Sequence, residues 1–284
     1  MKIGNDAGHG VGTYGGTDPG AAGSRSKEAV NNQLIANQFE AILRARGVEV
    51  LNIGGYSGYP LVKRPGVANS AGVNAGISWH CNASDFNNVR GLSLHVQTPE
   101  CRGHALAQKI EAHLLPILQK WGVPYRGIVI QNLEMTRETN APWVLIEDGF
   151  ITNDTDQDLE MNPRYVNDIA STVADGVMEY LGISVSPTPT PQPAPQPAPA
   201  PGPRQIKLNL TRRIKEGCKG EDVKRVQARL IELGYPCGKW GTDGVDGNDT
   251  TNAILHYQHD HGLPVDSEVW PGYPTQKALE EGRR

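Results

Sequence analysis

Apolar and polar positions alternate with two different periods along residues 1–184. Five short apolar or β-rich runs, each bounded by Gly, Asn or Pro, are expected to form strands. They are residues 1–5, 48–53, 76–79, 92–97 and 143–146. Two longer stretches carry apolar residues on one helical face. This alternation predicts an α/β fold class, with a mostly parallel open sheet flanked by helices.

The two helical stretches have apolar faces that the sequence defines clearly. Their apolar positions are Leu34, Ile35, Phe39, Ile42 and Leu43 in the first, and Val166, Ile169, Val173, Val177 and Leu181 in the second. Ser26 is the expected N-cap of the first helix and Gly47 its expected stop. Glu28 is therefore expected near the start of that helix.

Proline recurs through residues 186–203, SPTPTPQPAPQPAPAPGP, too often for a helix or a sheet. As a polyproline II spacer this segment would reach on the order of 50 Å, at about 3.1 Å per residue. Beyond it, apolar residues at helical spacing fit a small all-α domain of three helices. We therefore expect a domain at 1–184, a Pro-rich linker at 185–205 and a second domain at 206–284.

Charge and hydropathy exclude several classes of partner. Lys and Arg number 27 against 31 Asp and Glu, so no basic field exists to attract nucleic acid or an anionic membrane. No stretch approaches the roughly 20 apolar residues that cross a bilayer. Residues 1–3 run directly into the first predicted strand, without the pattern of a signal peptide. We expect no nucleic-acid partner and no transmembrane segment.

The four cysteines lack the CxxC spacing of zinc sites. Cys218 and Cys237 form either a disulfide or two buried free thiols. Cys81 follows His80 in a predicted strand, so its side chain is expected on the opposite face, in the core.

Four ionisable residues are placed where strands end or a helix begins. His9 follows the first strand in a glycine-rich turn, His80 ends the third strand, Glu147 ends a later one, and Glu28 lies near the start of the first helix. Functional crevices in open α/β sheets lie at the carboxyl ends of the strands, so these side chains should converge.

Two imidazoles and one carboxylate, with a fourth position open, form a known ligand set for catalytic zinc. Such a set would leave Glu147 as a general base for hydrolysis of an amide. Each residue alone also fits a structural role; Glu28, for example, could complement a helix N-terminus. The pattern by itself leaves both interpretations open.

Several motifs occur in the order typical of one family. They are NDAGHG at 5–10, TDPGAAG at 17–23, KEAVNNQLIANQFEAIL at 27–43, Arg64 with Ala68 and Asn69, WHCNA at 79–83, TRETNAPWVLIEDGFITN at 136–153, and Asp156. Together they resemble the zinc-dependent N-acetylmuramoyl-L-alanine amidases of bacterial autolysins and phage endolysins, over nearly all of residues 1–184.

The resemblance implies that His9, Glu28 and His80 bind Zn²⁺ and that Glu147 is the catalytic glutamate. The implied reaction is hydrolysis of the peptidoglycan amide between the lactyl group of N-acetylmuramic acid and L-alanine of the stem peptide. The sequence departs from the family after Leu51, where NIGGYSGYP replaces the usual Thr-Arg and Asp. Substrate contacts from that loop are therefore left open.

The resemblance also suggests how the enzyme is used. The interval from His80 to Glu147 is too short for the helical insertion by which some cell-division amidases block their own site, so constitutive activity is expected. Because no leader is seen in the sequence, a monomeric phage endolysin, accumulated in the host cytoplasm and acting on the cell wall, is favoured over a secreted autolysin. The alternatives are a zinc peptidase that cuts within the stem peptide and a non-catalytic wall-binding protein.

Residues 214–279 resemble a small helical peptidoglycan-binding domain. The resemblance rests on GEDVKRVQARLIELGY at 220–235, DGVDGNDTTNAILHYQHDHGLPVD at 243–266 and a degenerate PGYPTQKAL at 271–279. Asp246 stands where the family usually has an aromatic residue. The resemblance implies peptidoglycan as the partner of this domain.

Other candidate sites are weaker. The Asp243, Asp246 and Asp249 group lacks the late glutamate of a calcium loop, and His256, His259 and His261 are expected to face solvent on a short helix. No metal is expected at either group. Asp6 is a candidate for orienting a ligating histidine. No partner is expected to converge on His95, His104 or His113.

Overall fold

The structure is a computed structural model that describes residues 1–183, 205–235, 237, 241–261, 263 and 267–283. The chain divides into two compact units, Met1–Thr188 and Pro189–Arg284, each with a hydrophobic core of its own. The predicted spacer at 186–203 lies outside the described residues, so the linker boundaries stay a prediction. Among the helices of the described residues, none is long and apolar enough to cross a membrane.

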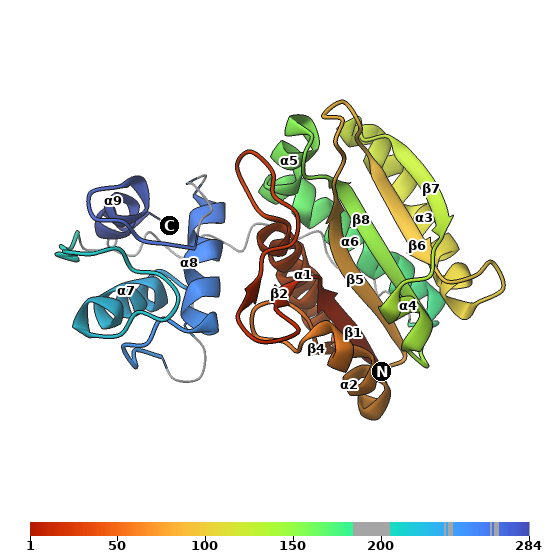
Figure 1. Cartoon of the computed structure of the whole chain (residues 1–284), viewed down its shortest axis with the longest axis horizontal. Helices are drawn as coiled ribbons and strands as arrows, with labels where there is room; N and C mark the ends of the chain where they lie inside the picture. Colours follow the sequence, from red (N-terminus) through yellow and green to blue (C-terminus); the bar gives the residue numbers. More distant parts are fainter. Residues whose placement is uncertain (184–204, 236, 238–240, 262, 264–266, 284) are drawn as a thin grey trace. The chain divides into compact units, whose positions relative to one another are not determined.

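A six-stranded sheet with the order β4-β1-β5-β8-β6-β7 forms the centre of the first unit (Figure 1). Its strands are β1 (Lys2–Ala7), β4 (Glu49–Asn52), β5 (Ala75–Asn82), β6 (Leu92–Val96), β7 (Tyr125–Ile130) and β8 (Trp143–Phe150). Neighbouring strands are parallel except at β6, which runs antiparallel to β8. The predicted mostly parallel sheet is confirmed. Strand β7 was not predicted, and neither was the short antiparallel ribbon of β2 (Gly10–Val11) and β3 (Thr17–Asp18).

Helices cover both faces of this sheet (Figure 1). The larger layer consists of α1 (Glu28–Ala45), α3 (Arg102–Trp121) and α6 (Pro163–Tyr180), whose apolar faces form the main core with the sheet. A thinner layer on the other face contains the 3-10 turn η1 (Leu61–Lys63), α2 (Arg64–Ala71) and α4 (Glu134–Glu138), around Trp143. Helix α5 (Asp154–Glu160) leads into α6.

The ends of α1 differ in part from the prediction. The N-cap is Lys27, which makes no side-chain capping bond. Ser26 is not the cap, because its hydroxyl donates instead to Asn31 Oδ1 at 2.6 Å. The predicted stop at Gly47 is confirmed: the helix ends at Ala45, and Gly47 has the left-handed φ of 75° common just after a helix.

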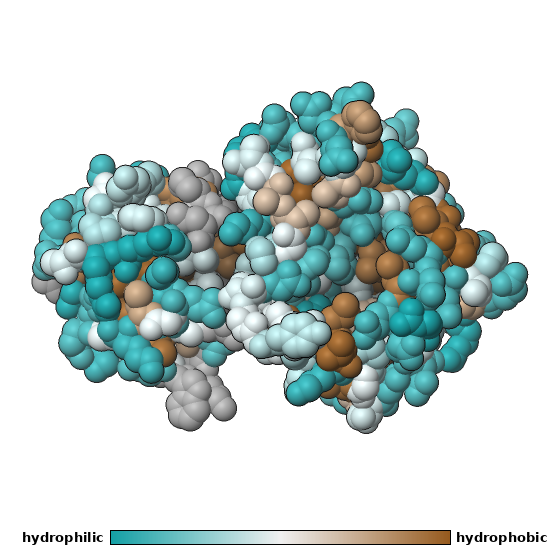
Figure 2. Space-filling model, viewed as in Figure 1, coloured by the Kyte–Doolittle hydropathy of each residue, from teal (hydrophilic) through white to brown (hydrophobic). Residues whose placement is uncertain are grey.

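Strand β7 forms one edge of the sheet, and hydrophobic residues gather along this edge (Figure 2). Ile130 is 47% exposed there. Gly127 has a φ of 91°, and the β6–β7 register shifts between Leu92 and Leu94. Irregularities of this kind reduce the tendency of an edge strand to pair with another chain.

The second unit contains the three predicted helices among its described residues. They are α7 (Glu221–Glu232), α8 (Asn248–Asp260) and α9 (Pro274–Glu281). Asp246 is fully buried, and its Oδ1 accepts a hydrogen bond from the Thr251 hydroxyl at 3.0 Å. A polar contact thus occupies the position of the family's aromatic residue. All four cysteines are free thiols, so Cys218 and Cys237 do not form the disulfide that the sequence left open.

Candidate metal centre and catalytic carboxylate

His9 lies in the turn directly after β1, with a left-handed φ of 63°. This conformation is unfavourable for a residue other than glycine and needs support from its surroundings. Arg64, which is buried, donates from Nη2 to the carbonyl oxygen of His9 at 2.6 Å. Its Nη1 donates to Asp6 Oδ1 at 2.9 Å. Asp6 therefore supports the backbone of the turn through Arg64, and it does not orient a histidine ring by a hydrogen bond of its own as the sequence suggested.

Asp18, at the end of β3, has the role that was predicted for Asp6. Its Oδ2 accepts a hydrogen bond from His9 Nδ1 at 2.9 Å, and its Oδ1 accepts one from the Gly20 backbone N–H at 3.1 Å. A carboxylate on one ring nitrogen of a histidine fixes the orientation of the other nitrogen toward a metal. Sequence reasoning assigned no role to Asp18, although it belongs to the TDPGAAG motif.

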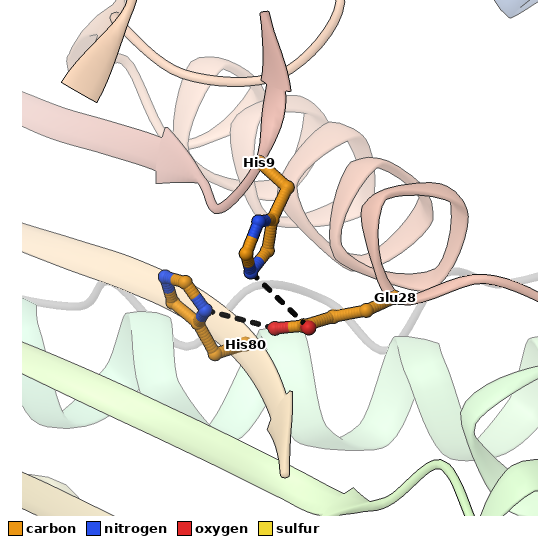
Figure 3. Close-up of side chains that lie close together, drawn as sticks. All are labelled: His9, Glu28 and His80. Carbon is orange, nitrogen blue, oxygen red and sulfur yellow. Dashed lines mark hydrogen bonds and ion pairs between the residues drawn. The ribbon is translucent and has the colours of Figure 1, made fainter. Parts of the chain in front are cut away.

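Glu28, the first residue of α1, extends its carboxylate to both imidazoles (Figure 3). Its Oε2 is 3.1 Å from His9 Nε2 and its Oε1 is 2.9 Å from His80 Nδ1. The backbone N–H groups of Ala21 and Cys81 donate to the same two oxygens, at 2.9 and 3.2 Å. The fold thus brings together the three residues that the sequence singled out as metal ligands.

The ligand atoms of His9, Glu28 and His80 all lie within 4.8 Å of one another, and no other such group occurs in the part of the chain that is described. Burial disfavours a charged His9, yet hydrogen bonds and charges from Glu28 and then Asp18 raise its pKa to about 9. Burial also opposes ionisation of Glu28, but the two imidazoles hold its pKa well below its usual range. Positive charge is therefore favoured at this point, and the donor set fits a divalent ion such as zinc.

Two glycines let the backbone approach the site closely. A Cβ atom at Gly8 would lie 2.4 Å from the His80 imidazole. A Cβ atom at Gly20, which has a φ of 64°, would lie 2.7 Å from Glu28 Oε2. Both motifs that contain these glycines were noticed in the sequence, but the reason for the glycines is visible only in the structure.

Glu147 lies in β8, paired in parallel register with His80 in β5. Paired residues of adjacent strands are about 4.8 Å apart and share one face of the sheet. Glu147 Oε2 is buried and has no hydrogen-bond partner in the part of the chain that the structure describes. Burial raises the pKa of this carboxyl to about 7; the charge of Glu28 raises the pKa further, and the two histidines lower it by smaller amounts.

The strand ends were predicted too early. Strand β5 continues two residues beyond His80 to Asn82, and β8 continues three residues beyond Glu147 to Phe150. Both side chains are nevertheless near the carboxyl ends of their strands, where α1 also begins. The inference from strand position thus located them correctly at this edge of the sheet.

A cavity of about 180 Å³ opens beside the histidines. Its walls include His9, Asp18 and His80 together with the apolar side chains of Val11, Leu61 and Leu145. Such a mixture of apolar walls and a few convergent polar groups is typical of a binding site for a small organic group.

The residues expected to be structural have ordinary roles. Cys81 is buried, as predicted. His95, for which no partner was expected, lies within hydrogen-bonding distance of Ser93 Oγ, at 2.9 Å, and Gln131 Oε1, at 2.7 Å. Asp243 Oδ1 accepts from the Gln227 side chain at 2.8 Å. The side chains of His256 and His259 lie outside the described residues, so the prediction for their group stays a prediction.

The family model for N-acetylmuramoyl-L-alanine amidase matches residues 3–179, more than half of the chain. The chain belongs to the N-acetylmuramoyl-L-alanine amidase family. A second family model, for a peptidoglycan binding domain, matches residues 219–277. Both resemblances inferred from the sequence motifs are thereby confirmed.

Relatives of this amidase-family chain include phage and bacterial proteins. It is 29% identical over 181 residues to the endolysin of Bacillus phage SPP1, covering 63% of this chain and 65% of the endolysin. It is 29% identical over 170 residues to the amidase LytC of Bacillus subtilis (strain 168), covering 59% of this chain and 34% of LytC. The matches therefore span less than two thirds of either relative.

Solved structures of amidases share the fold of the first unit. The catalytic domain of CwlV, an N-acetylmuramoyl-L-alanine amidase from Bacillus (Paenibacillus) polymyxa var. colistinus, superimposes with a TM-score of 0.58 at 28% identity. The match covers 65% of this chain and 99% of that domain. The predicted α/β fold class is therefore that of known amidase catalytic domains.

Proposed function

We propose that this chain is a zinc-dependent N-acetylmuramoyl-L-alanine amidase that cleaves the amide between the lactyl group of N-acetylmuramic acid and L-alanine of the stem peptide. The observation that carries the proposal is the His9, Glu28 and His80 group beside the buried Glu147, in a chain of the amidase family. Zinc held by these three ligands would activate water and polarise the amide carbonyl.

Glu147 has the properties of the proton carrier in this reaction. A general base works best when its pKa is near the working pH, and burial raises the pKa of Glu147 to about 7. Its Oε2 has no hydrogen-bond partner among the described residues and is available to hold a proton. In the proposal, Glu147 accepts the proton of the attacking water and passes it to the amine that leaves.

The two units have complementary roles in this proposal. Residues 1–184 form the catalytic domain, and residues 206–284 bind peptidoglycan, as the family match for 219–277 suggests. Residues 185–205 form a tether, which raises the local concentration of the catalytic domain at the wall. The match with the SPP1 endolysin supports use in phage lysis. In our proposal the enzyme is a constitutively active monomer that acts on the host wall.

Digestion of purified sacculi with no added protein partner tests the activity. We expect mass spectrometry to find free lactyl carboxylates on the glycan and stem peptides with a new L-alanine amino group. New amino groups within the stem peptide would instead indicate a peptidase. Binding without any product would indicate a wall-binding protein.

Two changes test the assigned residues. Glu147→Gln should lower the rate by about 10²- to 10⁴-fold while the protein still binds zinc, as measured by elemental analysis. His80→Ala should lose both zinc and activity. A chelated wild-type protein that still degrades sacculi at its original rate would refute the proposed zinc dependence.

A further inference from the structure

Two aromatic rings are exposed next to each other in the segment between α8 and α9. Trp270 is 37% exposed and Tyr273 is 61% exposed. Their ring centroids are 5.9 Å apart and the ring planes meet at 45°. Among the ring pairs of the described residues, no other has both rings exposed. Neighbouring exposed aromatic residues of this kind often mark a binding surface.

Trp270 is held in a fixed position by its neighbours. The guanidinium of Arg213 stacks 4.5 Å from the indole centroid, and the indole Nε1–H donates to Glu268 Oε2 at 2.9 Å. The preceding residue, Val269, exchanges two backbone hydrogen bonds with Ile214, each of 3.0 Å. A ring that is already fixed loses little conformational freedom when a ligand stacks on it.

The two charged groups that contact the Trp270 ring, Arg213 and Glu268, compensate each other. Arg213 forms an ion pair with Glu268, so its charge is compensated beneath the indole. Tyr273 is tied to the same turn, because its backbone N–H donates to the Trp270 carbonyl at 3.2 Å. An uncharged ligand with a flat apolar face fits this surface better than a charged one.

Peptidoglycan offers two chemically different parts, a glycan strand and a stem peptide with free charges. A pyranose ring presents C–H groups on its faces and hydroxyl and acetamido groups at its edge. Its face can pack on the electron-rich face of an aromatic ring, while its edge reaches polar groups nearby. The glycan is therefore the part that matches these rings.

We propose that Trp270 and Tyr273 form a sugar-binding platform that takes an N-acetylhexosamine residue of the glycan strand by stacking. The inference rests on the proposed function, because it takes peptidoglycan to be the ligand. Amide cleavage removes peptides and leaves the glycan strand intact, so a platform that grips the sugar keeps its ligand as the wall is digested.

Co-sedimentation with purified sacculi tests the platform. Every variant is the full chain and carries Glu147→Gln, so that the sacculi are not consumed. We expect Trp270→Ala and Tyr273→Ala each to weaken binding by roughly 10-fold or more, as for central aromatic anchors elsewhere. Ile231→Ala is the matched control, because it removes a side chain that is 40% exposed on α7 of the same unit, and it should bind as the parent does.

Two conservative variants separate ring stacking from folding. Trp270→Phe keeps a ring and should retain much of the binding, whereas Trp270→Leu keeps an apolar side chain without a ring and should lose it. Circular dichroism and melting curves identify any variant that fails to fold. Equal binding by the parent, Trp270→Ala and Trp270→Leu would overturn the proposal.

Competition identifies the part of the wall that is bound. Tetra-N-acetylchitotetraose should displace the parent protein from sacculi, and the stem tripeptide L-Ala-γ-D-Glu-L-Lys should not. Displacement by the tripeptide alone would overturn the assignment to sugar.

The catalytic proposal is tested separately from the platform. With Glu147 intact, the wild type and the Ile231→Ala control should cleave a small soluble muropeptide at the same rate. Failure of both proteins to cleave it would count against the amidase proposal and leave the binding result unaffected.

Discussion

His9 combines an unfavourable backbone conformation with two carboxylate neighbours. Its φ of 63° places the imidazole between Asp18 and Glu28, and Arg64 holds its carbonyl group. A single side chain is thus fixed from the backbone and from both ring nitrogens. Residues held in this way are common at functional sites, where the surrounding structure offsets the strain.

Replacement of Asp18 tests this arrangement. In Asp18→Asn the carboxylate charge next to His9 Nδ1 is lost, so the imidazole becomes less basic and less well oriented. We expect zinc affinity to fall by about 10- to 100-fold, as measured by competition with a chromophoric chelator. Glu49→Gln removes an exposed carboxylate at the start of β4 and should leave the affinity unchanged; an equal loss in both variants would contradict the role of Asp18.

Asp148, the residue after Glu147, gives stability a dependence on pH. Burial raises the pKa of its carboxyl to about 7, although the Tyr165 hydroxyl donates to Oδ1 at 3.0 Å. The folded protein therefore binds this proton more tightly than the unfolded chain, whose Asp pKa is about 3.9. The contribution of the protonated Asp148 carboxyl to the free energy of unfolding is fully present below about pH 4, and it is lost as the pH rises toward about 7.

Asp148→Asn removes that dependence while keeping an oxygen that accepts from Tyr165. We expect the wild type to lose up to about 4 kcal/mol more stability than the variant between pH 4 and pH 8, as an upper bound. Urea unfolding at several pH values measures the difference. Parallel stability curves for the two proteins would show that Asp148 is not protonated in the folded state.

The register of neighbouring strands explains why two positions in the sheet are glycines. Gly4 in β1, Gly76 in β5 and Trp143 in β8 are neighbours in one row of the sheet. A Cβ atom at Gly76 would lie 2.1 Å from the Trp143 ring, and one at Gly4 would lie 2.5 Å from it. The two glycines therefore make room for the indole that forms the centre of the thinner helical layer.

Two glycine substitutions should have opposite effects on the stability of the first unit, because Gly76 lies in a crowded strand and Gly66 in a helix with open space around it. Gly76→Ala overpacks the sheet beneath Trp143 and should destabilise the first unit by about 1–3 kcal/mol. Gly66→Ala lies in α2, where an added Cβ meets nothing within 4 Å, and should stabilise it by about 0.5–1 kcal/mol. Denaturant midpoints of both variants give the sign, and a stabilising Gly76→Ala would disprove the close approach.

The whole chain has two cores that belong to different stretches of sequence. The first unit buries apolar residues between its sheet and helices, and the second buries a separate set around α7, α8 and α9. Cores of this kind can unfold independently, since a cooperative transition requires shared packing.

Calorimetry of the full chain should therefore show two transitions. Removal of residues 185–284 should delete one transition and shift the other by no more than a few degrees. Zinc binds only the folded first unit in our proposal, so a chelator should lower the temperature of that transition alone. One cooperative transition for the full chain would mean that the two units stabilise each other.

Helices and strands with strong periodicity were predictable from the sequence, because local hydrophobic spacing decides which face is buried. Helix α1 and strands β1, β5 and β8 are examples. Helix α3 was overlooked, although Leu106, Ile110, Leu114 and Leu118 recur every four residues and all are buried. Pro116 lies within this helix, and proline ordinarily argues against a helix interior.

The sequence by itself determined the candidate metal ligands: His9, Glu28 and His80 stand next to predicted strand ends and a helix start, and the family motifs single out the same three residues. Only the tertiary structure decided which carboxylate serves which partner: Asp18 meets His9, whereas Asp6 meets Arg64. The physical reason is that strand position is a local property, while a hydrogen bond between distant residues depends on register and on the path of each loop. The Arg213 support under Trp270 is of the same kind, because it joins two segments that meet only after folding.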